Sequence, residues 1–232
     1  MKARVPEALP AAADERRQEA ANEKSNRKML NYAHRSLLIS AHNVLGYGGV
    51  RLKRLSYQSY DIGEEYIADH TDKKLLTSVE DMLAGAEAEY EETNFFETVE
   101  DTFGALRRDL LLFGFDPDAS LWGRMPFSNA DFPQTWRKVT ASQRRKRRAY
   151  LFYANEMSQL CRTMICMGLM ELHQNGGVGA ERMERVVAPV REDWFRLMRV
   201  YLAADSAGVT REQKAMLDRF NEMGCFAEEV LV

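Results

Sequence analysis

The sequence contains no run of eighteen consecutive apolar residues, so it predicts no membrane-spanning helix. The N-terminal residues lack the apolar core of a signal peptide. There are only three cysteines, and so sparse a set is typical of the reducing cytosol. The 32 Lys and Arg residues nearly balance 35 Asp and Glu residues, which argues against attraction of nucleic acid or membrane over the whole surface. We therefore expect a cytoplasmic protein without a membrane partner, in which only local patches bind charged molecules.

Catalytic and metal-binding signatures are also missing. The sequence has no Gly-x-Ser-x-Gly elbow, no His-Glu-x-x-His motif and no P-loop ending in Gly-Lys-Ser/Thr. The cysteines and histidines lack the spacing of a metal site; they are Cys161, Cys166, Cys225, His34, His42, His70 and His173. These absences predict a protein that is not an enzyme and that holds neither a metal nor a cofactor.

Helical periodicity dominates the first part of the chain. From Lys28 to Leu45, apolar residues recur at steps of three and four, and the glycine-rich residues 46–49 then end the helix. A second helix follows, and its apolar face consists of Leu52, Leu55, Ser59, Ile62 and Tyr66. Residues 77–90 predict a third helix. Residues 1–27 hold two prolines and no aromatic residue, so we expect a mobile arm there.

The middle of the chain is less regular. Residues 103–113 predict a helix that buries Leu106, Leu110 and Phe113. The loop after this helix is rich in turn-forming residues but carries aromatic side chains that would pack it down; they are Phe115, Trp122, Phe127 and Phe132. A long helix is expected from Ala141 to about Gln174, and its apolar stretch places it at the centre of a bundle.

Two segments of the chain repeat each other. Residues 42–55 and 173–186 align without a gap, and they share one histidine, two glycines and two arginines. In both segments an apolar helix precedes a glycine turn and an amphipathic helix follows it. A third helix recurs if Met82-Leu83 corresponds to Met216-Leu217. The simplest explanation is a tandem duplication. The alternative is chance, because glycine at a helix end and arginine on a helix face are common.

Together these patterns predict an all-α fold, a helical bundle of two related three-helix units with an irregular inserted middle segment. The expected organisation is a mobile N-terminal arm at 1–27, a first repeat unit at 28–93, an inserted helix and aromatic-rich loop at 94–135, and a second repeat unit at 136–232.

The repeated turns and their arginines each have two interpretations. Glycines before a helix start can cradle a phosphate, but nucleotide-binding loops follow a strand and these turns follow a helix, which favours a plain interhelical turn. Arg51 and Arg54, like Arg182 and Arg185, share one helix face. They either bind an anion or an acidic partner, or they pair with nearby carboxylates.

The strongest charge feature is a run of five cations, with Arg137 and Lys138 shortly before it. The run consists of Arg144, Arg145, Lys146, Arg147 and Arg148. One interpretation is contact with nucleic-acid phosphates. The other is that these cations offset the acidic stretch at residues 80–101.

Residues 37–55 resemble small helical proteins encoded in prophages of Clostridia-like bacteria. The resemblance rests on an apolar helix, the turn Gly46-Tyr47-Gly48, and then Arg51-Leu52. The second copy departs from this pattern, because Val178 replaces the aromatic residue. The resemblance implies an origin in a phage or mobile element, and hence a bacterial host cell, but no activity.

Two functions fit these features. The first is a non-catalytic accessory protein of a phage or mobile element that docks on a protein or ribonucleoprotein, for example to inhibit a host defence nuclease as anti-CRISPR proteins do. Its contact residues would be Tyr47, Trp122, Phe127, Glu89, Glu91 and Glu92. The alternative is a nucleic-acid-binding protein that uses the basic helix 137–148 and the duplicated pairs, with Arg51, Arg54, Arg144, Arg145, Lys146, Arg147, Arg148, Arg182 and Arg185 as contacts. The sequence leaves the oligomeric state open.

Overall fold

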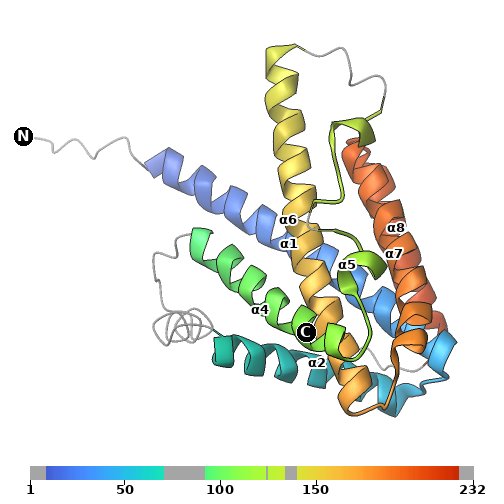
Figure 1. Cartoon of the computed structure of the whole chain (residues 1–232). Coiled ribbons are helices and arrows are strands. Elements are labelled where there is room, and N and C mark those ends of the chain that lie inside the picture. Colours follow the sequence, from blue (N-terminus) through green and yellow to red (C-terminus); the bar gives the residue numbers. More distant parts are fainter. Residues whose placement is uncertain (1–8, 71–91, 124, 134–139, 225–232) are drawn as a thin grey trace, which may run out of the picture.

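The computed structural model describes residues 9–70, 92–123, 125–133 and 140–224, and this part of the chain is all-α (Figure 1). These ranges contain seven α-helices, one 3₁₀ turn and no strand. The elements are α1 (Leu9–Leu45), α2 (Gly49–His70), α4 (Glu92–Leu112), α5 (Pro117–Ser120), η1 (Asn129–Asp131), α6 (Ala141–Gln174), α7 (Ala180–Leu202) and α8 (Ser206–Glu222). The predicted helical bundle is confirmed. None of the described helices is both long and apolar enough to cross a bilayer.

Two helices begin earlier than the sequence patterns predicted. α1 begins at Leu9, so most of the segment expected to be a mobile arm is helical; its many alanines favour this conformation. α4 begins at Glu92 rather than at Phe103, because its buried stripe extends back to Val99. Phe113 lies beyond the end of α4, is 40% exposed and stacks on His173 instead of being buried. The helix expected at 77–90, with Met82-Leu83, lies outside the described residues.

The two glycine turns share a left-handed glycine and a hydrogen bond from a histidine. Gly46 and Gly177 both adopt left-handed conformations, with φ of +68° and +61°, which glycine reaches without steric cost. In the first turn, the ring of His42 donates from Nδ1 to the carbonyl of Tyr47 at 2.8 Å. In the second, His173 makes the equivalent bond to its own turn at 3.1 Å. The repeat seen in the sequence is therefore also a repeat of structure.

The two repeated helix pairs are interlocked. α1 makes its most extensive contacts with α7, and α2 with α6, whereas α1 touches α2, and α6 touches α7, much less. The sequence analysis placed α4 in the inserted segment, but α4 takes the place in the first unit that α8 takes in the second: α4 packs on α6 and α2, and α8 packs on α1 and α7. Exchanging the two units leaves this pattern unchanged, as a two-fold rotation would. Each unit therefore buries its apolar face on the other, and both share one hydrophobic core.

The segment between α4 and α6 is packed down, as its aromatic residues predicted. All four predicted aromatic anchors are buried. The indole of Trp122 donates from Nε1 to the carbonyl of Ser158 on α6 at 2.8 Å and stacks on Trp194 of α7, with ring centroids 5.5 Å apart. Arg191 of α7 donates to the carbonyl of Ser120 at 2.7 Å. The segment thus crosses both long helices of the second unit (Figure 1).

α6 lies at the centre of the bundle, as expected from its apolar stretch. It packs against α1, α2, α4 and α7. Cys161, Ile165 and Cys166 on this helix are fully buried. Burial raises the pKa of both thiols well above the usual range, so both cysteines are neutral side chains of the core.

Candidate functional site

The aromatic residues expected to contact a partner are buried. Tyr47 is 8% exposed, Trp122 3% and Phe127 7%. The backbone of Phe127 exchanges two hydrogen bonds with the side chain of Asn155, each 3.2 Å long. Trp122 and Phe127 therefore pack the core instead of forming the expected contact surface, because their polar groups find partners inside the protein.

The acidic members of that expected surface are outside the described structure. Glu89 and Glu91 belong to residues 71–91, and the side chain of Glu92, the first residue of α4, is not described. The acidic contacts of the docking hypothesis therefore stay predictions.

The run of five cations lies near the start of α6. Four of its side chains are exposed: Arg144, Arg145, Lys146 and Arg148. Arg147 turns back onto the middle segment, where its guanidinium donates to the carbonyl of Asn129 at 2.6 Å and lies 4.7 Å from the centroid of the Phe132 ring. Arg147 is therefore a structural contact rather than a free cation. Arg137 and Lys138 lie outside the described residues.

The four exposed cations have no acidic partner in the described part of the chain, where no carboxylate lies within 4.0 Å of their side-chain nitrogens. The sequence left open whether the acidic stretch 80–101 offsets them. Asp101 on α4, which belongs to this stretch, forms no ion pair with them. Within the part of the chain that the structure describes, no carboxylate therefore neutralises these four cations.

An exposed aromatic residue accompanies these cations. Phe152 is 66% exposed, which is unusual for a side chain of its size. It follows Arg148 by four residues and Arg145 by seven, so the three side chains share one face of α6. We name Arg144, Arg145, Lys146, Arg148 and Phe152 the α6 patch.

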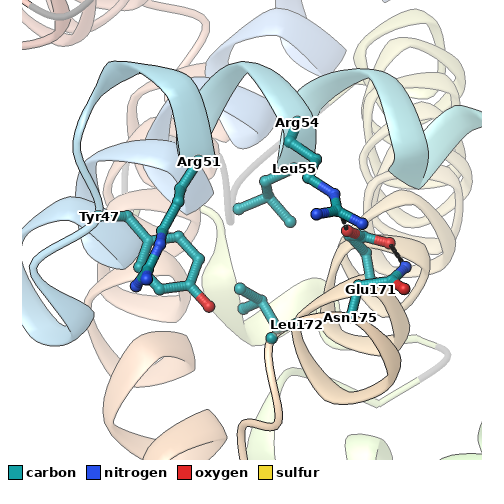
Figure 2. A pocket seen from close by; sticks show the side chains of 8 residues that line it. Tyr47, Arg51, Arg54, Leu55, Glu171, Leu172 and Asn175 are labelled. Atoms are coloured by element: carbon teal, nitrogen blue, oxygen red, sulfur yellow. Dashed lines mark hydrogen bonds and ion pairs between the residues drawn. The ribbon is translucent and has the colours of Figure 1, made fainter.

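The duplicated arginine pairs lie at the other end of α6. Twenty-six residues separate Arg145 from Glu171, which corresponds to about 40 Å along a helix. The first pair lines a pocket of about 240 Å³ (Figure 2), together with residues of both units: Tyr47, Arg51, Arg54, Leu55, Glu171, Leu172, Asn175 and Gly176. We name it the Arg51 pocket. Leu55 and Leu172 lie between its two polar ends.

The first polar end combines a guanidinium with a phenol. The Arg51 guanidinium lies 5.4 Å from the centroid of the Tyr47 ring, close enough for a cation–π contact. A Cβ added at Gly176 would lie 2.5 Å from the Tyr47 hydroxyl oxygen. The same Cβ would lie 2.5 Å from the carbonyl oxygen of Leu172, so the backbone and the phenol both favour glycine at position 176.

The second polar end is a hydrogen-bonded group around a buried carboxylate. The Asn175 amide donates to Glu171, and Nε of Arg54 lies 4.0 Å from the same carboxylate while donating to Gln58 at 2.5 Å. Burial raises the pKa of Glu171, against the opposing effects of Asn175 and Arg54. Arg54 is therefore engaged within the protein, whereas Arg51 has no carboxylate partner among the described residues.

The second pair lines the equivalent pocket, of about 300 Å³, with Val44 and Leu45. At the offset of the repeat these two apolar residues correspond to Asn175 and Gly176. Arg185 is paired with Glu181 at 3.4 Å. We name this site the Arg182 pocket. The repeated arginines thus have different surroundings in the two units.

Sequence reasoning missed two contributors. Phe152 could have been found from its spacing to Arg145 and Arg148. Glu171 could have been noticed as a charged residue at the end of the apolar stretch of α6, but its contact with Arg54 comes from the packing of α6 on α2. No group of His, Cys, Asp or Glu in the described residues is arranged to hold a metal ion.

Comparison with known proteins adds no relative. No family model matches the chain, and searches of the curated proteins and of the solved structures found no match. The resemblance of residues 37–55 to prophage proteins stays a prediction.

Proposed function

We propose that this protein binds single-stranded nucleic acid through the α6 patch. The observation that supports this proposal is a set of four exposed cationic side chains without a carboxylate partner among the described residues. Neighbouring cations repel one another, and an external polyanion relieves that repulsion.

Phosphates are the natural partners of such a patch. Each neutralised phosphate releases condensed counterions, so binding weakens steeply as salt increases. With four contacts, the slope of log K against log salt is about −3 for a single strand. The overall charge of −3 does not oppose this, because screening at physiological salt limits the influence of distant charges to about 8 Å.

The exposed aromatic ring favours a single strand over a duplex. Phe152 shares a face with Arg145 and Arg148, so a base can stack on the ring while its phosphates meet the guanidinium groups. Bases in a duplex are already stacked on their neighbours and do not offer that surface.

The docking hypothesis has less support. Trp122 and Phe127 are core residues, so these two side chains do not serve as aromatic anchors of a protein interface. An origin in a phage or mobile element and inhibition of a host defence nuclease stay predictions.

Fluorescence anisotropy with a labelled single strand and the matching duplex, over a salt series, tests the proposal. The wild type should bind the single strand more tightly, with the slope given above. Reversing Arg144, Arg145, Lys146 and Arg148 to Glu should abolish binding. A matched control reverses Lys53, Arg108, Arg199 and Lys214, which are exposed elsewhere, and should retain most of the affinity.

Stacking is tested separately. Phe152→Ala should weaken single-strand binding about tenfold, since base–aromatic stacking contributes about 1–3 kcal/mol per base. Leu112→Ala removes a similarly exposed apolar side chain at the end of α4 and should change nothing. Absence of binding at low salt, or equal loss in both charge-reversed variants, would contradict the proposal. Equal affinity for duplex, unaffected by Phe152→Ala, would contradict the single-strand assignment.

A further inference from the structure

We propose that the Arg51 pocket binds the phosphate group of a small molecule, at a site separate from the α6 patch. The Arg182 pocket, which has the same arginine positions, does not bind such a ligand. This inference does not depend on nucleic-acid binding.

The Arg51 end of the pocket offers several hydrogen-bond donors to one anion. A guanidinium presents two parallel N–H groups to an oxyanion, and that of Arg51 is held near the Tyr47 ring. The Tyr47 hydroxyl lies at the same pocket and is a third donor. Three donors suit a tetrahedral oxyanion better than a carboxylate, which has only two oxygens.

The turn that carries Tyr47 is held in place, and space is left for its hydroxyl. The His42 ring donates to the carbonyl of Tyr47 at 2.8 Å, which holds the turn. Gly176, in the turn between α6 and α7 of the other unit, leaves space for the hydroxyl, because an added Cβ would lie 2.5 Å from it. Groups that are held before the ligand arrives lose little conformational entropy on binding.

The rest of the pocket restricts the ligand. At about 240 Å³ it is smaller than the pockets of about 300–1,000 Å³ that enclose drug-sized molecules. Leu55 and Leu172 provide a short apolar stretch, and Glu171 at the far end repels a second anionic group. These walls fit a small phosphate monoester whose hydroxyl groups face Glu171, and they disfavour a polyanion.

The Arg182 pocket lacks these features. Val178 takes the place of Tyr47, so there is no hydroxyl, and Leu45 takes the place of Gly176. Its other arginine, Arg185, is paired with Glu181. The two pockets therefore provide a built-in comparison in which the arginines are constant and the other ligand contacts vary.

Equilibrium dialysis with radiolabelled inorganic phosphate, at constant ionic strength, tests this inference. We expect one saturable site per chain. Arg51→Gln should weaken phosphate binding about tenfold or more, because it removes a charge-assisted pair of hydrogen bonds. Arg182→Gln, the matched control, should leave it within twofold. Tyr47→Phe keeps the ring, removes only the hydroxyl and should weaken binding severalfold.

A fourth variant is expected to change the phosphate affinity in the opposite direction. Glu171→Gln removes the negative charge at the pocket and should tighten phosphate binding severalfold, the reverse of Arg51→Gln. Circular dichroism confirms that each variant is folded. No saturable binding, equal effects of Arg51→Gln and Arg182→Gln, or weaker binding by folded Glu171→Gln would each overturn the inference.

A phosphate could also belong to a nucleic-acid backbone. Single-strand affinity that is unchanged by Arg51→Gln assigns the site to a small phosphate monoester. An equal loss of single-strand and inorganic phosphate binding would instead assign it to the backbone and overturn the separation of the two sites. The charge-reversed α6 variant should bind inorganic phosphate as the wild type does. Phosphate binding at the Arg51 pocket can therefore be judged even if the protein does not bind nucleic acid.

Discussion

The two three-helix units keep the same turn but surround it with different side chains. The bonds from His42 and His173 to their turns, and the left-handed Gly46 and Gly177, are shared. At other equivalent positions, Gly63 in the first unit corresponds to Trp194 in the second. Backbone geometry has thus been kept where a helix must reverse direction, and side-chain volume has changed where neighbours could compensate for it.

The difference in side-chain volume at each of these two positions matches a difference in the neighbouring residues. Trp194 fills space beside the middle segment, which packs on the second unit, and it stacks there on Trp122. At Gly63, a Cβ would lie 2.8 Å from the sulfur of Met167 on α6. Trp194 and Gly63 therefore differ in size because their neighbours differ, although they occupy equivalent positions on equivalent helices.

The largest expected effect comes from removing the side chain that distinguishes the second unit. Trp194→Ala should lower the free energy of unfolding by about 3–5 kcal/mol, because it opens a cavity in a packed core. Gly63→Ala should stay within about 1 kcal/mol, since the flexible tip of Met167 can move and alanine favours the helix. Urea denaturation followed by circular dichroism measures both. Similar losses in the two variants would show that the units do not differ in packing as described.

A smaller effect on the free energy of unfolding is expected at His34, whose equivalent in the second unit is Ile165. The His34 ring is 3% exposed, and its Nε2 has no hydrogen-bond partner. Burial, with a smaller contribution from Arg35, lowers the pKa of His34 from 6.5 to about 4. The unfolded chain therefore takes up a proton below about pH 6.5, whereas the folded protein does so only near pH 4.

The free energy of unfolding should consequently fall as the pH drops from about 6.5 to 4, by up to about 1.4 kcal/mol per pH unit from this group. His34→Ile copies the second unit and should remove that part of the pH dependence. The difference between the two proteins in urea denaturation across this range isolates the contribution of His34. Parallel pH profiles would contradict the assignment of a neutral, buried imidazole.

The smallest expected effect tests what the two units share. Gly46→Ala and Gly177→Ala should each lower the free energy of unfolding by about 1–2 kcal/mol, because an L-residue is strained at positive φ. An added Cβ meets nothing within 4 Å at either position, so backbone strain is the only cost. Thermal and urea unfolding should give equal losses to within about 0.5 kcal/mol, the usual error of such comparisons. Clearly unequal losses would show that the turns are not equivalent.

Much of the fold could be predicted from the sequence because its signals are local. The buried face of α2, with Leu52 and Leu55, follows from helical periodicity. The span of α6 follows from a pattern that no proline interrupts. The early start of α4 was missed although Val99 continues the helical spacing of Phe103, Leu106 and Leu110 towards the N-terminus. Trp122 was predicted both to pack the loop down and to contact a partner, and the structure supports only the packing role. An aromatic residue in a loop has the same sequence signature in both roles.

The sequence by itself determined the helices, the repeated turns and the cationic start of α6, because each depends on residues within a few turns of one another. Only the tertiary structure decided that the two units interlock and that Arg147 is bound internally while Lys146 and Arg148 have no carboxylate partner among the described residues. It also decided that Glu171 reaches Arg54, whereas no described carboxylate of the other unit reaches Arg185. These contacts join residues far apart in the chain. They depend on how the apolar faces of separate helices pack, which no local pattern specifies.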